Sequence, residues 1–440
     1  MGPVVAKALK ATTVAKTAPS ASSKPSPTAK PTPLAGAPRA LQIEYAIRDV
    51  VIPARALEAQ GHSVIKLNVG DPCAAGFAPP PHMVEALHQA ALENVNGYTA
   101  SEGDPLLIDA IIRREKRRNK VTYAPSDVLV TNGSGEGIQM LLGASVNPGD
   151  EVLIPGPSYP PYDSLVKYFG GKPVHYRTIE DEDWQPDVDD LRRKITPKSK
   201  AVCLINPNNP TGALYSPKVV KQFAEVVGEH ERQLFMLSDE IYDEMTFDGK
   251  QQASRAVAPD VPMATLNGFS KIYLVPGWRL GHILWNDPHG TLSAIRDGVT
   301  RSSRVRLCAS SVAQRAGVAA LDGPQDHIAK TNAALKKRRD YCVKRLNSIS
   351  GMSSAKPDGA FYVFPKITAL ETAKGKKAWK GDKEFVLDFL NTEKVLTVHG
   401  SGFGQDYGSG HLRIVMLPDI PILQTALDRL ERFIRVRGAS

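Results

Sequence analysis

The sequence lacks several features that would place it in other protein classes. No apolar run reaches eighteen residues, so we expect no membrane-spanning helix. The ten histidines form no His-Glu-x-x-His motif or close ligand pair, and the four cysteines form no Cys-x-x-Cys pair. These absences argue against a metal site. The sparse, widely spaced cysteines favour a reducing compartment, such as the cytoplasm.

Acidic residues are absent before Glu44, whereas five lysines and Arg39 lie there. These six positive charges supply most of the formal net charge of +9 and leave +3 for the rest of the chain. The basic character therefore belongs largely to this segment and does not indicate nucleic-acid binding. Residues 1–38 are rich in Ala, Pro, Ser, Thr and Lys, which predicts a disordered tail. An organellar transit peptide is the alternative, although the prolines argue against it.

The remaining sequence has the pattern of a large α/β protein. A chain of 440 residues with 42% hydrophobic content can form two domains and a sizeable core. Apolar strands alternate with helical patterns through its middle part. This alternation predicts a mostly parallel sheet that is covered by helices on both faces.

Lys271 lies in the segment NGFSKIYLVPGWRLG (residues 267–281), behind an apolar run. Burial disfavours the charged form of an amine, and a lysine without its proton attacks carbonyls such as the aldehyde of pyridoxal phosphate. Arg279, eight residues further on, could hold the phosphate of that cofactor. Because most lysines are solvated surface charges, this interpretation needs support from other segments.

Two segments lie at the ends of apolar strands and carry side chains that suit a cofactor ring. In SDEIYDEM, Asp239 is either a helix N-cap or the partner of a pyridine nitrogen, and Tyr242 could reach the same ring. In INPNNPTG, two X-Pro bonds could include a cis bond that directs Asn209 toward a ring oxygen. An ordinary turn is the alternative for this second segment.

A strand, a glycine-rich turn and a helix follow one another in DVLVTNGSGEGIQMLLGA (residues 127–144). Backbone N–H groups at such a helix start bind phosphate. The glycine spacing departs from the dinucleotide fingerprint, and the next strand, EVLIPGPSYPPY, ends without the expected ribose-binding acid. We therefore expect the phosphate of a cofactor other than NAD, with Tyr159 available to stack on its ring.

In this order, the segments resemble those of the class I and II aminotransferases, which are pyridoxal-phosphate-dependent enzymes of fold type I. The resemblance runs from about Glu44 to near the C-terminus. It implies a large domain with a mostly parallel seven-stranded sheet between helices, and a smaller α+β domain. The expected boundaries are a tail over residues 1–38, an N-terminal segment with part of the small domain over 39–79, the large domain over 80–320 and the rest of the small domain over 321–440.

The resemblance also implies roles for individual residues. Lys271 would be the Schiff-base lysine and the general base, Asp239 would pair with the pyridine nitrogen, and Tyr159 would stack on the ring. The other implied cofactor ligands are Ser134, Gly135, Glu136, Asn209, Tyr242, Ser270 and Arg279, together with Tyr98 of the neighbouring subunit. This last contact implies a homodimer with shared active sites.

A substrate amino acid needs a fixed cation for its α-carboxylate, and a planar guanidinium binds a carboxylate bidentately. Arg413 in HLRIVMLP suits this role because its neighbours are apolar enough to bury it; a surface arginine on a strand is the alternative. By resemblance, Gly70 and Asn209 would also contact the substrate, and Tyr45 would lie near the mouth of the site.

Within the family, the segments PGPSYPPY, KPDGAFYVFPKI and HLRIVMLP resemble those of alanine (glutamate–pyruvate) aminotransferases. The expected reaction moves an amino group between L-alanine and 2-oxoglutarate by a ping-pong mechanism. One methyl group changes binding by only about 1–3 kcal/mol, so aromatic and branched-chain substrates stay open. A lyase or synthase on the same fold would share the cofactor residues and is the other alternative.

Overall fold

A computed structural model describes residues 34–230, 234–370 and 378–438. The chain divides into two units, Met1–Ala37 and Pro38–Ser440, and every helix and strand given below belongs to the second. Most of the predicted basic tail, residues 1–33, lies outside the described residues.

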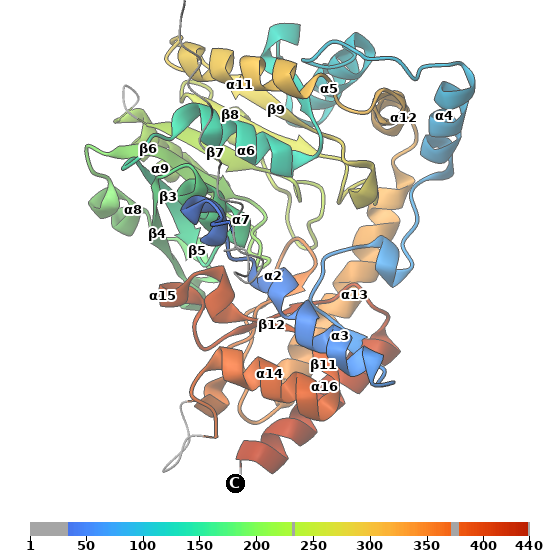
Figure 1. Ribbon diagram of the computed structural model, residues 1–440, viewed down its shortest axis with the longest axis vertical. Helices are drawn as coiled ribbons and strands as arrows, with labels where there is room; N and C mark the ends of the chain where they lie inside the picture. Colours follow the sequence, from blue (N-terminus) through green and yellow to red (C-terminus); the bar gives the residue numbers. More distant parts are fainter. Residues whose placement is uncertain (1–33, 231–233, 371–377, 439–440) are drawn as a thin grey trace, which may run out of the picture. The chain divides into compact units, whose positions relative to one another are not determined.

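A twisted central sheet organises the larger part of this second unit (Figure 1). Its strand order is β2-β9-β8-β7-β6-β3-β4-β5. Neighbouring strands pair in parallel from β8 through β4, whereas β9 is antiparallel to both of its neighbours and the two-residue β5 is antiparallel to β4. The strands are β2 (Val128–Thr131), β3 (Glu151–Gly156), β4 (Lys172–Ile179), β5 (Gln185–Pro186), β6 (Ser199–Ile205), β7 (Phe235–Asp239), β8 (Met263–Gly268) and β9 (Gly281–Asn286). The predicted seven strands are present, and β5 extends the sheet at its edge.

Alternating side chains of the central strands enter two different cores. In β3, Val152 and Ile154 pack into a core with helices α6, α7 and α11, whereas Leu153 packs on the opposite face with α8 and α9. This period of two is the geometry of a strand that is buried on both faces. The helices are α6 (Ser134–Ser145), α7 (Pro160–Tyr168), α8 (Val188–Lys194), α9 (Pro217–Gly228) and α11 (Ser293–Arg306).

Two smaller sheets lie in the other part of the unit. The antiparallel sheet has the order β10-β13-β12, and β1 pairs in parallel with β11. The β1-β11 pair joins the segment before residue 79 to the C-terminal part of the chain, as Figure 1 shows by the blue and red ribbons lying together. These strands are β1 (Ile65–Lys66), β10 (Tyr362–Val363), β11 (Val395–Leu396), β12 (Val398–His399) and β13 (Leu412–Val415). The helices not yet named are α1 (Pro38–Leu41), α2 (Ala46–Asp49), α3 (Val51–Ala59), α4 (Pro81–Leu92), α5 (Pro105–Asn119), α10 (Ser254–Val257), α12 (Ser311–Asp322), α13 (Asp326–Ser348), α14 (Asp382–Glu393), α15 (Gln405–Gly408) and α16 (Ile420–Gly438).

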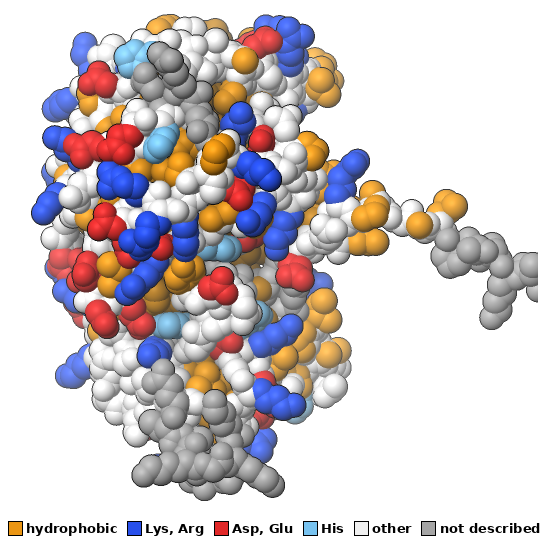
Figure 2. Space-filling model, turned by 90° about the vertical axis from the view of Figure 1, so that its left-hand side faces the viewer, with side chains coloured by type: hydrophobic (Ala, Val, Ile, Leu, Met, Phe, Trp, Pro, Cys, Tyr) orange, Lys and Arg blue, Asp and Glu red, His pale blue; other side chains and the backbone are white. Residues whose placement is uncertain are grey.

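Charged side chains of both signs cover the face of the molecule shown in Figure 2. None of the described helices is long and apolar enough to cross a membrane. On the face shown in Figure 2, basic side chains are interspersed with acidic ones. The exposed helix α8 illustrates this pattern, because Arg192 and Arg193 both form ion pairs with nearby carboxylates.

An aromatic cluster holds α14 and α16 together. The Phe433 ring centroid lies 5.2 Å from the ring centroids of Trp379, Phe385 and Phe389, and Phe433 is 1% exposed. Such a ring contributes both buried apolar area and aromatic contacts.

We predict that Phe433→Ala lowers the free energy of unfolding by about 3–5 kcal/mol, because it leaves a cavity among three rings. Phe433→Leu keeps most of the volume and should cost less than about 2 kcal/mol. Urea unfolding of both variants followed by circular dichroism measures the difference. Equal, small effects would show that the cluster is not a stabilising core.

Candidate active site

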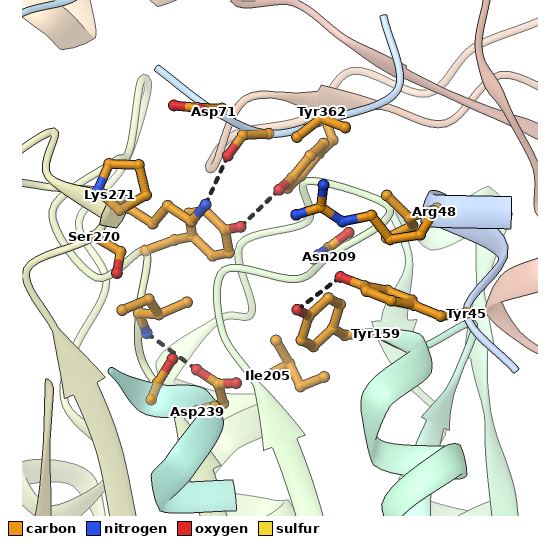
Figure 3. A pocket seen from close by; sticks show the side chains of 18 of the residues that line it. Tyr45, Arg48, Asp71, Tyr159, Ile205, Asn209, Asp239, Ser270, Lys271 and Tyr362 are labelled. Carbon is orange, nitrogen blue, oxygen red and sulfur yellow. Dashed lines mark hydrogen bonds between the residues drawn. The ribbon is translucent and has the colours of Figure 1, made fainter. Parts of the chain in front are cut away.

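A cavity of about 480 Å³ lies where the carboxyl ends of the parallel strands meet the part of the chain that carries the two smaller sheets. Figure 3 shows its interior, with Lys271 and Asp239 on one side and Tyr45 and Arg48 on the other. The predicted site residues that line it are Tyr45, Gly70, Ser134, Gly135, Tyr159, Asn209, Asp239, Tyr242, Ser270, Lys271, Arg279 and Arg413. Sequence segments spread over more than 360 positions are thus brought together.

Lys271 follows β8 and projects into the cavity. Its Nζ donates a hydrogen bond of 2.7 Å to the carbonyl oxygen of Gly70. Burial lowers the pKa of Lys271 to about 8; the charges of Arg413 and Arg279 act in the same direction, and that of Asp71 opposes them. A lysine in this state is a nucleophile and a base near neutral pH.

Asp239 is the last residue of β7 and is 4% exposed. Its carboxylate accepts hydrogen bonds from the Tyr162 hydroxyl at 2.8 Å and from the Ile241 amide at 3.3 Å. Burial raises the pKa of Asp239 to about 6, while these two hydrogen bonds lower it. No helix starts in the turn that follows Asp239, so the helix N-cap alternative does not apply.

The start of α6 and Arg279 form a cradle of donors. Ser134 and Gly135 open the helix after Gly133, whose φ of 78° is in the left-handed region. Arg279 donates to the carbonyl oxygens of Asn132 and Pro276 at 3.2 and 2.8 Å, which holds its guanidinium beside this turn. A Cβ atom on Gly133 would lie 2.4 Å from Arg279 Nη2, so only glycine permits this approach.

Two of the predicted cofactor ligands do not line the cavity. The Glu136 amide donates to the carbonyl oxygen of Gly133, and the Glu136 carboxylate accepts from the Asn132 amide at 2.7 Å and from Arg306 at 2.8 Å. Glu136 thus braces the turn that carries Ser134. Tyr98 is 84% exposed, in the loop before α5.

Tyrosines and an asparagine form the wall opposite the helix. The hydroxyls of Tyr45 and Tyr159 lie 3.2 Å apart, and those of Tyr242 and Tyr362 lie 2.7 Å apart. Asn209 follows the Asn206–Pro207 peptide bond, which is cis, and it is 5% exposed. Buried hydroxyls and an amide around an aromatic-lined space can bind a flat, polar ring.

Arg413 lies in β13 and is 1% exposed, so the surface-arginine alternative does not apply. One Nη donates to Asn209 Oδ1 at 2.9 Å and the other donates to the carbonyl oxygen of Asn68. Its Nε has no hydrogen-bond partner among the described residues, and burial lowers the pKa of the guanidinium. A buried cation without a carboxylate partner is prepared to bind an anion.

Gly70 gives the substrate side of the cavity its close packing. A Cβ atom at this position would lie 2.5 Å from the Tyr362 hydroxyl and 2.6 Å from the Phe361 ring. The backbone of Gly70 therefore approaches the cavity more closely than any other residue type would allow.

Arg48 also lines the cavity, although no motif in the sequence marks it. Its guanidinium points inward from α2 (Figure 3) and forms no ion pair or hydrogen bond with another described residue. The signal in the sequence is its position three residues after Tyr45, because residues three apart share one face of a helical turn.

The geometry fits pyridoxal phosphate. A helix N-terminus with Arg279 suits a phosphate, a buried carboxylate suits a ring nitrogen, and a lysine with a lowered pKa suits an aldehyde. The described residues include no cluster of His, Cys, Asp or Glu that could hold a metal ion.

Comparison with known proteins agrees with this geometry. The family model for aminotransferases of class I and II matches residues 62–430. The glutamate-pyruvate aminotransferase AlaA of Haemophilus influenzae is 36% identical over 405 residues, which cover 90% of this chain and 98% of that protein. The chain belongs to the class I and II aminotransferases.

Other relatives support both the fold and the family. A solved alanine aminotransferase from Pyrococcus furiosus matches this aminotransferase with a TM-score of 0.87 and 52% identity, covering 91% of this chain and 100% of that one. The aspartate aminotransferase of Geobacillus stearothermophilus is 33% identical over 388 residues, which cover 88% of this chain and 95% of that protein. The predicted fold type I architecture and the dependence on pyridoxal phosphate are confirmed.

The pKa of Lys271 leads to a prediction about cofactor capture. Its pKa of about 8, against 10.5 for an ordinary lysine, means that the amine form dominates above pH 8. The rate at which cofactor-free enzyme bonds pyridoxal phosphate should therefore rise through pH 8 and level off about one unit higher. Stopped-flow absorbance on mixing measures this rate. A rate that keeps rising to pH 10 would show that Lys271 titrates like a surface lysine.

Proposed function

We propose that this aminotransferase exchanges an amino group between L-alanine and 2-oxoglutarate and so forms pyruvate and L-glutamate. The observation that carries the proposal is a single cavity that holds Lys271 with two guanidinium groups besides that of Arg279, the buried Arg413 and the inward-pointing Arg48. The names of the Haemophilus and Pyrococcus relatives support alanine and glutamate as substrates. The Geobacillus relative makes aspartate the amino donor to compare first.

For the cofactor, we assign the phosphate to Ser270, Arg279 and the backbone N–H groups of Ser134 and Gly135. Asp239 pairs with the pyridine nitrogen, and Tyr159 stacks on the ring. Asn209 and Tyr242 bind the ring hydroxyl. We keep Glu136 among the residues beside the phosphate, although the contacts of its carboxylate with Asn132 and Arg306 indicate that it braces the turn.

When bound, pyridoxal phosphate supplies an electron sink that acidifies the Cα proton of an amino acid. Lys271 Nζ takes this proton, because its lowered pKa keeps part of the lysine population unprotonated near neutral pH. The surrounding tyrosines stay neutral, since burial raises the pKa values of Tyr159 and Tyr242 well above the ordinary value. Their hydroxyls therefore act as hydrogen-bonding groups and do not compete for the proton.

Two arginines at different depths explain how one site accepts two unlike substrates. Arg413 binds the α-carboxylate that alanine and glutamate share, beside Gly70 and Asn209. Arg48 binds the distal carboxylate that only glutamate and 2-oxoglutarate carry. Its side chain is exposed at the Tyr45 side of the cavity and has no hydrogen-bond or ion-pair partner among the described residues, so it can leave the cavity when alanine binds.

We further propose that two chains form a homodimer in which Tyr98 reaches the partner's phosphate site. Three exposed side chains support this: Tyr98 is 84%, Val305 is 87% and Leu307 is 51% exposed. The segments that carry them lie together, because Arg306 donates to the carbonyl oxygen of Ser101 at 2.8 Å. An apolar patch of this kind is typical of a protein interface.

We also retain the predicted domain boundaries: an N-terminal segment with part of the small domain over residues 39–79, the large domain over 80–320 and the rest of the small domain over 321–440. The pairing of β1 with β11 supports this division. The cytoplasm remains the proposed location, supported by four cysteines that are all free thiols.

Initial-rate kinetics with a panel of amino acids and 2-oxoglutarate test the function. We predict parallel double-reciprocal lines and the highest kcat/KM for L-alanine and L-glutamate. Arg413→Leu should lower kcat/KM by about 100-fold or more, because it leaves the α-carboxylate unpaired in a buried site, and should spare cofactor absorbance. A preference for aspartate, aromatic or branched-chain donors would overturn the substrate. Ammonia release without an oxo-acid acceptor would favour a lyase.

Arg48 allows a sharper test of substrate discrimination. Arg48→Gln should raise the KM for L-glutamate and 2-oxoglutarate by about 10-fold or more, because it removes one charge-assisted contact, and should change the KM for L-alanine by less than about 2-fold. Arg55→Gln is the matched control, since Arg55 is exposed on the neighbouring α3 and lies outside the cavity lining. Equal effects on both substrates would remove Arg48 from distal-carboxylate binding.

A further inference from the structure

Tyr162 is a buried residue that lies behind the cavity wall. It belongs to the first turn of α7, has no exposed surface and is not part of the cavity lining. Its hydroxyl donates a hydrogen bond of 2.8 Å to Asp239 Oδ2. Its ring packs edge-on against Tyr159, and its hydroxyl acts on the cavity through Asp239.

The surroundings of Asp239 make this hydrogen bond important. Burial favours the neutral carboxylic acid of Asp239, and two hydrogen bonds oppose this effect of burial. The hydrogen bond from Tyr162 has the larger effect, and the longer one from the Ile241 amide has the smaller. A hydrogen bond to the charged form stabilises that form.

The other titratable neighbours of Asp239 carry no charge that would stabilise its ionised form. The Cys203 thiol on β6 and the Tyr159 phenol both have pKa values well above the ordinary value, because they are buried, so both are neutral. The pKa of Tyr162 itself is raised well above the ordinary value, first by burial and then by the Asp239 charge, so its hydroxyl keeps its proton and remains a donor.

We propose that Tyr162 is a positioning residue that keeps Asp239 ionised and aimed at the pyridine nitrogen of the cofactor. The proposal rests on the role assigned to Asp239 above. An ionised Asp239 stabilises a protonated ring nitrogen, and a protonated ring withdraws electrons from the substrate more strongly. Tyr162 thereby affects kcat, while substrate binding at Arg413 is left unchanged.

The test compares Tyr162→Phe with Tyr176→Phe in the cofactor-loaded enzyme. Tyr176 is a matched control because it is also fully buried and its hydroxyl donates at 2.7 Å to a carbonyl oxygen, that of Cys203. The readout is the ¹⁵N chemical shift of bound pyridoxal phosphate labelled at the ring nitrogen, followed over pH. This shift reports ring protonation directly and does not depend on turnover.

In Tyr162→Phe, the proton shared by Asp239 and the ring nitrogen should shift toward Asp239 by about 10-fold or more, because the ionised carboxylate has lost a hydrogen bond that the neutral acid needs less. The ¹⁵N shift near neutral pH should therefore move toward that of an unprotonated ring. The kcat with L-alanine should fall about 10-fold or more, with KM within about 2-fold. Tyr176→Phe should show neither change. In an Asp239→Asn background, adding Tyr162→Phe should have no further effect on the shift.

An unchanged ¹⁵N titration in Tyr162→Phe would overturn the proposal, even if kcat fell, because a lower kcat alone could come from altered packing. If Tyr162→Phe does not fold, 3-fluorotyrosine at position 162 supplies a more acidic donor of nearly the same size, and the ¹⁵N shift should then move toward that of a fully protonated ring. If the wild-type enzyme transaminates alanine but the Tyr162 variants show the wild-type ¹⁵N titration, this inference fails and the proposed function stands.

Discussion

The convergence of parallel strands at one edge of the central sheet is the constraint on which the site depends. β2, β3, β6, β7 and β8 end at this edge, and the residues that follow or close them include Ser134, Tyr159, Asn209, Asp239 and Lys271. Each strand is buried on both faces, so neither its register nor its direction can shift without exposing apolar side chains. The sheet thereby fixes functional groups that are up to 137 positions apart, from Ser134 to Lys271.

Incompletely compensated charges give this cavity its chemistry. Asp239, Lys271 and Arg413 are each held where burial disfavours their charged forms. Hydrogen bonds at Asp239, and electrostatic interactions at Lys271 and Arg413, offset only part of that effect. A ligand that brings a ring nitrogen, an aldehyde and a carboxylate to these three groups supplies the missing partners. The site is therefore organised before the ligands arrive, and its stability should increase when they bind.

The parts of the site that were predictable from the sequence are those carried by short, ordered motifs. Lys271, Asp239 and Asn209 follow apolar strands, and strand ends meet at one edge for topological reasons. Arg48 and Tyr162 were not predictable in this way, because their roles depend on packing between distant segments. The hydroxyl of Tyr162 meets Asp239 only when α7 docks on the sheet. Likewise, the Glu136 amide is used within its own turn, which glycine spacing alone does not reveal.

The central claim is that Lys271 and its neighbours support a complete amino-group exchange between alanine and 2-oxoglutarate. The most direct measurement is the absorbance spectrum of the cofactor-loaded enzyme with L-alanine alone, followed by addition of 2-oxoglutarate. We predict that alanine converts the long-wavelength band to that of the aminated cofactor, with one pyruvate formed per site, and that 2-oxoglutarate restores the band. A band that alanine leaves unchanged, while another amino acid converts it, would contradict the proposed substrate.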